Sequence, residues 1–190
     1  MKPAVFLDRD GTLIEELGYL TPSSELRVYP WAVDAVRLLN RAGLAVVVVT
    51  NQGGIARGLY TSAFVEETHR RLAERFAAGG ATIDGWQYCP HHPEALIDGF
   101  GGPCVCRKPE AGMVHAAAAS CGPFDLAASW VVGDQWRDVQ LGHLMGGRSI
   151  LVRSGHGAEQ DQNWPPDIAR PTAICDNLIA ACARILDGMV

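Results

Sequence analysis

The sequence contains no long hydrophobic run and no excess of basic residues. No apolar stretch among the 190 residues approaches the about 20 residues that a membrane-spanning helix needs. Lysine and arginine number 16 against 21 acidic residues, and the formal net charge is -5, whereas nucleic-acid binders usually carry a basic excess. We therefore expect neither a membrane nor a nucleic-acid partner. Because a strand is expected to begin at Pro3, no signal peptide fits before it, and a cytoplasmic protein is predicted.

The sequence also has no internal repeat, and its composition is that of one packed domain. Hydrophobic residues make up 48% of the chain, which is enough to bury a sizeable core. We expect one catalytic domain over residues 1–190 and a monomer. The predicted class is α/β, because short apolar strands alternate with amphipathic helices. The expected strands are Pro3–Leu7, Ala45–Val49, Ile83–Tyr88, Trp130–Val132 and Ser149–Val152, and the expected helices are Trp31–Ala42, Ser62–Ala78, Met113–Cys121 and Asn177–Leu186.

The predicted helices carry apolar residues at helical spacing. In the first, Val33, Val36, Leu38 and Leu39 fall near one stripe. Such stripes are typical of helices that cover a sheet. The segment Gly155–Pro171 is rich in Gly, Gln and Pro and is predicted to be a surface connection.

Six cysteines are present, but the chain is neither small nor poor in core residues, so a disulfide framework is not expected. Two pairs of potential ligands stand on either side of a glycine-rich loop: Cys89 with His91 or His92, and Cys104 with Cys106. Three thiolates and one imidazole suit tetrahedral zinc. From the residues alone, either histidine could be the fourth ligand. The remaining cysteines are expected to be ordinary buried thiols: Cys121, Cys175 and Cys182.

Polar residues follow the apolar strands at the points where the strands end. Asp8 and Asp10 follow the first strand, Thr50 follows the second, and Asp134 follows the strand at Trp130–Val132. In parallel α/β sheets, ligands bind at the carboxyl ends of the strands. Asp8 and Asp10 are two residues apart and can therefore meet one ligand.

Four segments together resemble the motifs of the haloacid dehalogenase superfamily of aspartyl-phosphate hydrolases. In chain order they are Asp8-Arg9-Asp10-Gly11-Thr12, Thr50-Asn51-Gln52-Gly53, Arg107-Lys108-Pro109 and Gly133-Asp134-Gln135-Trp136-Arg137-Asp138. The resemblance covers most of the chain. It implies a Rossmann-like parallel sheet with helices on both faces, a minimal cap, and a loop at about residues 89–106 that zinc stabilises.

The resemblance also implies roles for the motif residues. Asp8 is the expected nucleophile, and Asp10 is the expected general acid and base. Thr50 and Lys108 would stabilise the transferring phosphoryl group. Catalytic Mg²⁺ would bind the side chains of Asp8 and Asp134 and the backbone carbonyl of Asp10, while Asp138 would orient a ligand or a metal-bound water.

Within the superfamily, the C-x-H and C-x-C arms resemble the branch of heptose bisphosphate and histidinol phosphatases. That branch implies structural zinc on Cys89, His91, Cys104 and Cys106. The residue after the metal-binding aspartate is commonly lysine in this branch, and here it is Gln135.

The narrower resemblance is to the heptose bisphosphate phosphatases, which remove the C7 phosphate of a sugar bisphosphate and keep the C1 phosphate for nucleotide transfer. The planar fork of Arg107 suits the second phosphate, and the small phosphorylated sugar is the expected partner. The expected substrate contacts are Glu16, Leu17, Gly18, Tyr19, Asn51, Gln52, Gly53, Arg57 and Arg107.

Three other functions compete with this prediction. A histidinol-phosphate phosphatase would share the metals and the phosphoryl chemistry but would need a carboxylate for the substrate amine. A phospho-acceptor signalling domain would also use an aspartate, a threonine and a lysine beside Mg²⁺, but Asp10 favours rapid hydrolysis of the acyl phosphate. A metal-stabilised interaction module without catalysis is disfavoured by the intact set of motif residues.

Overall fold

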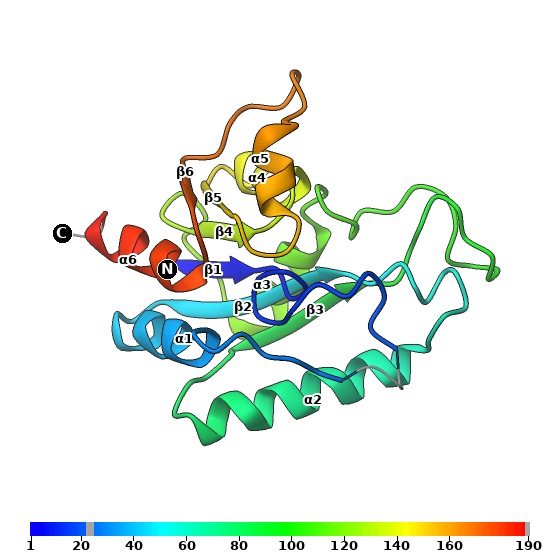
Figure 1. Cartoon of the computed structure of the whole chain (residues 1–190), viewed down its shortest axis with the longest axis horizontal. Coiled ribbons are helices and arrows are strands. Elements are labelled where there is room, and N and C mark those ends of the chain that lie inside the picture. Colours follow the sequence, from blue (N-terminus) through cyan, green and yellow to red (C-terminus); the bar gives the residue numbers. More distant parts are fainter. Residues whose placement is uncertain (22–24, 189–190) are drawn as a thin grey trace.

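The computed structural model describes residues 1–21 and 25–188, and at its centre lies a six-stranded sheet in which every pair of neighbouring strands is parallel (Figure 1). The strand order is β3-β2-β1-β4-β5-β6, so the chain winds outward from β1 in both directions. The strands are β1 (Ala4–Leu7), β2 (Ala45–Asn51), β3 (Gly85–Cys89), β4 (Trp130–Gly133), β5 (Arg148–Val152) and β6 (Ala173–Cys175).

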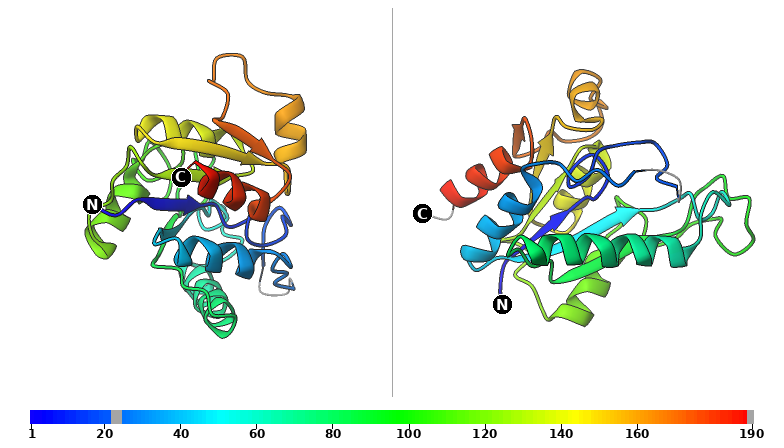
Figure 2. Two further views of the ribbon diagram at one scale, coloured as in Figure 1. Left: turned by 90° about the vertical axis from the view of Figure 1, so that its left-hand side faces the viewer. Right: turned by 60° about the horizontal axis from the view of Figure 1, so that its bottom comes forward.

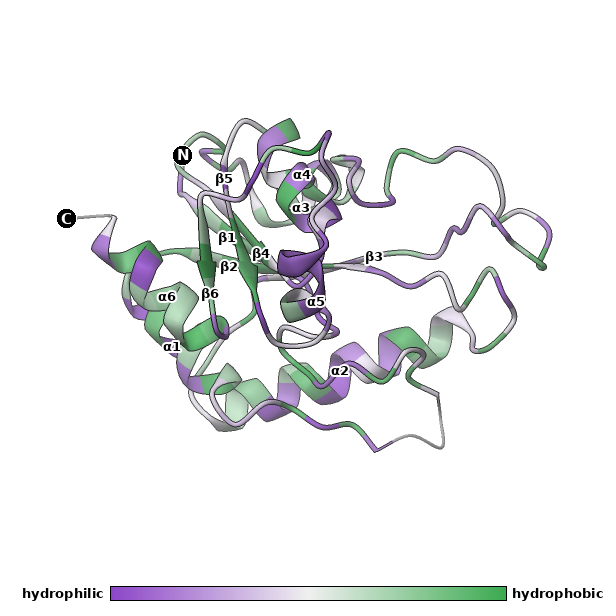
Figure 3. Cartoon of the chain, turned by 45° about the horizontal axis from the view of Figure 1, so that its top comes forward, coloured by the Kyte–Doolittle hydropathy of each residue, from purple (hydrophilic) through white to green (hydrophobic). Residues whose placement is uncertain are grey.

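Helices cover both faces of the sheet. On one face lie α1 (Ala32–Arg41), α2 (Ser62–Ala78) and α6 (Leu178–Asp187), and α1 and α6 pack side by side (Figure 2). On the other face lie α3 (Gly112–Cys121) and α4 (Trp136–Leu144). The short α5 (Gly157–Gln162) follows β5 and is largely hydrophilic, in contrast to the hydrophobic strands of the interior (Figure 3).

The two faces of β1 contribute to two separate hydrophobic clusters. Val5 and Leu7 point toward α1, α2 and α6, whereas Ala4 and Phe6 point toward α3 and α4. This division follows from the two-residue period of a strand. Because all four residues are fully buried, β1 is fixed in register and direction, and with it the position of the residues that follow its carboxyl end.

The predicted α/β class, with a parallel sheet and helices on both faces, is confirmed, and most predicted elements lie close to their observed bounds. Three elements were not predicted: α4, α5 and β6. The surface connection expected at 155–171 was therefore incomplete, because its first part forms α5. Two predictions of burial were wrong: Leu38 is 38% exposed on α1, and the Cys121 thiol lies at the exposed end of α3.

The chain reverses its winding direction between β1 and β4, and at such a point the loops after the two strands diverge and leave a crevice. The long loops that follow β1, β2 and β3 extend together from this end of the sheet (Figure 1). In the described residues, no helix is both long and apolar enough to cross a bilayer.

Candidate active site

Three buried carboxylates meet at the carboxyl ends of β1 and β4. Asp8 follows β1, and its backbone N–H donates to the carbonyl of Val132 at 2.9 Å. Asp134 follows β4, and Asp138 lies in the first turn of α4. One oxygen from each of the three side chains lies within 4.8 Å of the others. The structure thus brings together three of the carboxylates that the sequence assigned to the metal and the nucleophile.

The ammonium group of Lys108 lies between two of these carboxylates. Its Nζ is 2.8 Å from Asp8 Oδ1 and 2.7 Å from Asp138 Oδ1, and it donates to the carbonyl of Val49 at 2.8 Å. The ammonium group is therefore surrounded by three oxygen atoms, two of which belong to carboxylates. Asp138 also accepts the backbone N–H of Gln135 at 3.1 Å, so that the start of α4 holds its carboxylate in place.

Burial and the charges of neighbouring carboxylates make Asp8 and Asp134 hard to ionise. Burial raises the pKa of Asp8 to about 7, and the neighbouring charges of Asp138 and Asp10 add to that shift, while Lys108 opposes it. Burial, followed by the charges of Asp8 and Asp138, raises the pKa of Asp134 well above its usual range. Burial would lower the pKa of Lys108, but Asp138 and Asp8 outweigh it, and the net shift is upward.

The donor set fits a small divalent cation. Three carboxylates face one ammonium group, which leaves excess negative charge in a buried place. In addition, Asp134 Oδ1 is buried without a hydrogen-bond partner, whereas Asp134 Oδ2 accepts from the backbone N–H of His156 at 2.8 Å. An orphaned buried carboxylate oxygen is costly unless a cation or a donor meets it. Oxygen-only ligands are those that Mg²⁺ prefers.

Glycines make room around Asp134. Gly11 has a φ of +77°, and a Cβ atom on it would lie 2.1 Å from Asp134 Oδ2. Gly155, with a φ of +59°, would place a Cβ atom 2.3 Å from the same oxygen. Both backbones approach the carboxylate so closely that no side chain fits, and both have a conformation that glycine adopts readily.

Asp10 is held by its neighbours at the edge of the site. The guanidinium of Arg9 contacts both of its oxygens: Nε donates to Oδ2 and Nη2 donates to Oδ1, each at 3.1 Å. Gln52 Nε2 donates to Asp10 Oδ2 at 2.9 Å and to Thr50 Oγ1 at 2.9 Å. Asp10 is thus held between the cationic guanidinium of Arg9 and the neutral amide of Gln52.

Arg9 was not among the predicted site residues, although it stands between the two predicted aspartates. Its side chain is only 2% exposed, and Nη1 lies 3.4 Å from His69 Nε2 on α2. His69 stacks on Trp86, with ring centroids 4.8 Å apart. Burial and then the charge of Arg9 lower the pKa of His69 to about 3, so this histidine stays neutral beside the guanidinium.

Asn51 connects the second and third motifs. Its side-chain amide donates to the Lys108 carbonyl at 3.2 Å and accepts the Lys108 backbone N–H at 3.0 Å. This pair of bonds fixes the backbone of Lys108 relative to β2. The side chain of Asn51 is therefore occupied in positioning Lys108.

A cavity of about 290 Å³ opens in front of Asp8 and Asp10. Most of the predicted contacts line it: Asp8, Asp10, Glu16, Gly18, Tyr19, Asn51, Gln52, Gly53, Arg107 and Lys108. Further residues that line it were not predicted, namely Arg9, Leu20, Tyr60, His92, Arg137 and His156. Arg137 lies inside the fourth motif and His92 lies beside the zinc ligand His91, whereas Tyr60 and His156 come from segments without a motif.

Apart from the zinc ligands, five predicted residues do not line this cavity: Asp134 and Asp138 of the carboxylate cluster, and Leu17, Thr50 and Arg57. Thr50 is buried behind Gln52 and contacts Asp10 at 3.4 Å, while Leu17 is 44% exposed. Arg57 forms an ion pair with Glu94, and its Nη1 donates to Tyr19 Oη at 3.1 Å.

Glu16 lines the cavity. Burial raises the pKa of Glu16, and the charge of Asp10 adds to that shift.

Two arginines, Arg107 and Arg137, also line the cavity. Arg107 is half-buried, and its Nη1 donates to the carbonyl of His91 at 2.9 Å. A Cβ atom on Gly53 would lie 3.4 Å from that same Nη1, so the missing side chain of Gly53 leaves space for the guanidinium. Burial and then the charge of Arg137 lower the pKa of Arg107.

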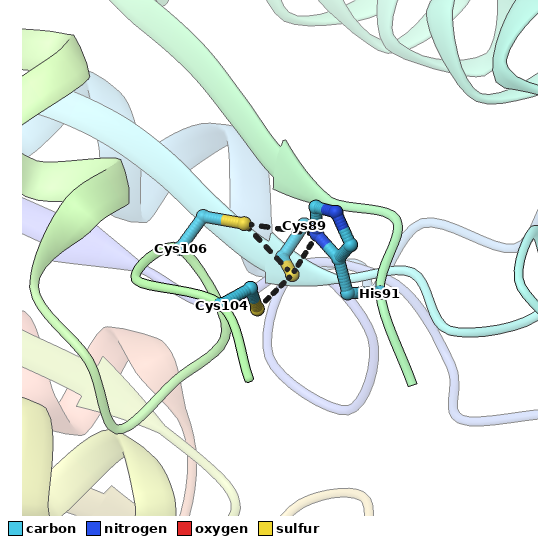
Figure 4. A group of neighbouring side chains, drawn as sticks. All are labelled: Cys89, His91, Cys104 and Cys106. Carbon is cyan, nitrogen blue, oxygen red and sulfur yellow. Dashed lines mark hydrogen bonds between the residues drawn. The ribbon is translucent and has the colours of Figure 1, made fainter. Parts of the chain in front are cut away.

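The four predicted zinc ligands lie close together (Figure 4). Cys89 Sγ lies 3.1 Å from Cys106 Sγ and 3.7 Å from Cys104 Sγ, and His91 Nδ1 lies 3.3 Å from Cys106 Sγ. These separations approach the about 3.8 Å between ligand atoms of a tetrahedral site with Zn–S bonds of about 2.3 Å. His92 instead accepts the backbone N–H of Glu94 at 3.0 Å and lines the cavity.

Comparison with known proteins places this geometry in a family. Residues 105–181 match the family described as HAD-hydrolase-like. A D-glycero-beta-D-manno-heptose-1,7-bisphosphate 7-phosphatase of Salmonella typhi is 42% identical over 167 residues, which cover 85% of this chain and 88% of the relative. A D-glycero-D-manno-heptose-1,7-bisphosphate 7-phosphatase of Thermosynechococcus vestitus is 38% identical over 184 residues, covering 95% of this chain and 93% of the relative.

A solved structure extends the similarity to the whole fold. The D,D-heptose 1,7-bisphosphate phosphatase of B. bronchiseptica, complexed with magnesium and phosphate, superimposes with a TM-score of 0.84 at 32% identity and covers 99% of both chains. The sequence resemblance to the haloacid dehalogenase superfamily is thereby confirmed. Because identity at this level extends over most of both chains, the protein belongs to the heptose-1,7-bisphosphate 7-phosphatase family of haloacid dehalogenase-like hydrolases.

Proposed function

We propose that this protein is a Mg²⁺-dependent phosphatase that hydrolyses the C7 phosphate of D-glycero-D-manno-heptose 1,7-bisphosphate and releases the 1-phosphate. The observation that carries the proposal is the cluster of Asp8, Lys108, Asp134 and Asp138, of which Asp8 and Lys108 line a cavity together with two arginines. Relatives that share about 40% of their residues with this chain bear the name of this activity. The proposed role in the cell is the supply of heptose 1-phosphate for nucleotide activation.

The proposed reaction has two steps. The carboxylate of Asp8 attacks phosphorus, the bond from phosphorus to the C7 oxygen breaks, and Asp10 gives its proton to that leaving oxygen. Water then attacks the aspartyl-phosphate, Asp10 takes a proton from that water, and Asp8 and inorganic phosphate are released. Asp10 lines the same cavity as Asp8, and Gln52 and Arg9 fix its direction.

Mg²⁺, where bound, would offset the charge repulsion between the phosphate and the carboxylates. The side chains of Asp8 and Asp134 and the backbone carbonyl of Asp10 would hold the ion, in keeping with the orphaned oxygen of Asp134. Lys108 neutralises part of the charge that collects when the phosphate enters. Asp138 positions that lysine through an ion pair of 2.7 Å.

Zinc on Cys89, His91, Cys104 and Cys106 would be structural, because four protein ligands leave no position for water or substrate. The loop that these residues close carries Arg107 and Lys108 into the cavity directly after its last ligand. A zinc ion would therefore fix the two basic residues that meet the substrate. Arg107 is proposed to bind the phosphate that stays on the sugar.

Phosphate release from a panel of substrates tests the proposal. The panel contains both anomers of the heptose bisphosphate, fructose 1,6-bisphosphate and histidinol phosphate, each assayed over a range of Mg²⁺ concentrations. We expect the heptose bisphosphate to give the highest kcat/KM and activity to vanish when Mg²⁺ is chelated. A higher kcat/KM for histidinol phosphate would contradict the proposed substrate.

The variant Asp8→Asn tests the proposed nucleophile. It is nearly isosteric and removes the attacking oxygen, so turnover should fall by a factor of at least about 10⁴. The circular dichroism spectrum and the melting temperature should stay close to those of the wild type. Substantial turnover by Asp8→Asn would contradict the assignment.

A further inference from the structure

Arg107 and Arg137 form a pair of like charges in the lining of the cavity. In residues 1–21 and 25–188, no acidic side chain forms an ion pair with either guanidinium. Arg107 is tied by one N–H to the carbonyl of His91, and Arg137 Nε is buried without a hydrogen-bond partner. Two neighbouring cations without an acid between them repel each other, and an anion between them would relieve that repulsion.

Arg137 reaches this place from the first turn of α4. Its guanidinium lies over the ring of Trp136 at 5.4 Å from the ring centroid, which limits the directions in which the fork can point. Arg137 and Arg107 both line the reaction cavity and also the adjoining open cavity of about 470 Å³. The pair therefore stands on the border between the two cavities.

The pair matches a phosphate group in charge and in geometry. A phosphate monoester carries a charge of about -1.5 to -2 near pH 7, which two guanidinium groups balance. Each guanidinium presents N–H donors in a planar fork that can bind two phosphate oxygens. Gln135 lines the same cavity and is neutral. The positive charge at the start of α4 therefore comes from Arg137.

We propose that Arg137, together with Arg107, binds the phosphate that remains on the sugar and thereby selects a bisphosphate over a monophosphate. This inference rests on the proposed function, and it assigns to Arg137 a specificity-determining role. Arg137 touches neither Asp8 nor Asp10 in the described structure, so its effect falls on substrate binding.

The test compares two substrates that differ only in the distal phosphate: the heptose 1,7-bisphosphate and the heptose 7-phosphate. In Arg137→Gln, the ratio of kcat/KM for the bisphosphate to kcat/KM for the monophosphate should fall about 10- to 100-fold, as expected for loss of a hydrogen bond to a charged group. Most of the loss of kcat/KM should appear as a higher KM for the bisphosphate. Arg137→Lys, which keeps the charge but not the fork, should lose less than Arg137→Gln.

Arg148→Gln is the matched control. Arg148 also lies over a tryptophan ring, that of Trp130 at 5.1 Å, but it lines neither cavity. Its substrate ratio should equal that of the wild type, and monophosphate hydrolysis by each variant reports whether the site has folded.

An unchanged ratio in Arg137→Gln would overturn the inference and leave the proposed function intact. An equal loss on both substrates would also overturn it. A wild-type protein that hydrolyses the monophosphate but not the bisphosphate would overturn both proposals.

Discussion

Three buried carboxylates share one ammonium group, and this imbalance governs the chemistry of the site. Lys108 pairs with Asp8 and Asp138 but leaves Asp134 to be met by one backbone N–H. Burial is the main reason that the pKa values of Asp8 and Asp134 are raised, and the excess negative charge of the neighbouring carboxylates adds to it. A cation that binds here replaces protons that those carboxylates would otherwise hold.

Arg9 is predicted to position Asp10 for proton transfer. Its guanidinium holds both Asp10 oxygens, and lysine cannot reproduce that two-point contact. In Arg9→Lys, kcat should fall by about 10- to 100-fold, a fraction of what general acid–base catalysis contributes. KM should change little. Steady-state kinetics at saturating Mg²⁺ provide the measurement, and a raised KM at unchanged kcat would instead assign Arg9 to substrate binding.

His69 is predicted to make the fold sensitive to acid. Because burial and Arg9 lower the folded pKa to about 3, only the unfolded chain takes up a proton as the pH falls below the usual value of about 6.5. The stability that neutral His69 contributes is complete above about pH 6.5 and is lost progressively toward pH 3. At pH 5 the loss amounts to about 2 kcal/mol.

The variant His69→Phe keeps an aromatic ring on Trp86 and removes the titrating group. Urea unfolding of both proteins at pH 7 and at pH 5 isolates the contribution of His69, since all other groups titrate in both. The wild type should lose more stability between the two pH values than the variant does. Equal losses would contradict the assignment of a neutral, buried His69.

Among the structural elements, the loop between β3 and α3 depends most on the proposed zinc. In the described residues it contains no helix or strand, and its cysteines form no disulfide. Its two ends are tied together by the cluster of four ligands and by the hydrogen bond from Arg107 to the carbonyl of His91. A loop of this length closed by a metal gains stability because the unfolded chain is constrained and the ligands are organised.

Cys104→Ser tests the zinc loop, with Cys121→Ser as the matched control. Cys121 is an exposed thiol on α3 and lies outside the cluster. The first variant should lose most of its bound zinc, and its Tm should fall by about 5–10 °C, which corresponds to roughly 2–3 kcal/mol at this size. Metal analysis and thermal melting are the measurements. Unchanged zinc content in Cys104→Ser would contradict the ligand set.

The strands and helices with strong apolar patterns could be predicted from the sequence, whereas three elements could not. β6 is short and half-buried, and α5 is largely polar, so neither carries a clear hydrophobic period. α4 begins inside the fourth motif, where Asp138 accepts the backbone N–H of Gln135 at the helix start and also pairs with Lys108. Because these residues belong to a motif of mostly polar residues, the start of α4 carries no clear pattern of apolar residues at helical spacing.

The candidate site was predictable where residues follow strands and was not where loops converge. Asp8, Asp10 and Asp134 lie directly after β1 and β4, and strand order alone brings them together. Arg137, Tyr60 and His156 reach the cavity from separate segments, and their distances depend on how long loops pack. The choice between His91 and His92 likewise depended on the family resemblance, and the structure places His91 among the cysteines.

Across the whole molecule, the sheet separates the packing of the core from the chemistry. The two hydrophobic clusters lie on its faces, while the cavity opens beyond the carboxyl ends of its strands. Mutations in the core should therefore alter stability with little effect on catalysis, as long as β1 keeps its register.

Ile185→Ala tests that separation. Ile185 is fully buried where α6 packs against α1 and the sheet. Its truncation should lower the free energy of unfolding by about 2–5 kcal/mol and leave kcat/KM at 25 °C within about twofold of the wild type. Leu38→Ala, at a residue 38% exposed on α1, is the control and should cost far less. A large loss of kcat/KM in the folded Ile185→Ala protein would contradict the separation.

The central claim is that the phosphoryl group passes through Asp8, and trapping the covalent intermediate tests it most directly. Substrate labelled in the C7 phosphate is mixed with enzyme and Mg²⁺, quenched in acid within milliseconds, and digested for peptide mapping. The account predicts label on the peptide that contains Asp8, formed and lost at rates consistent with kcat, and no label in Asp8→Asn. Label on another residue, or full turnover by Asp8→Asn, would contradict it.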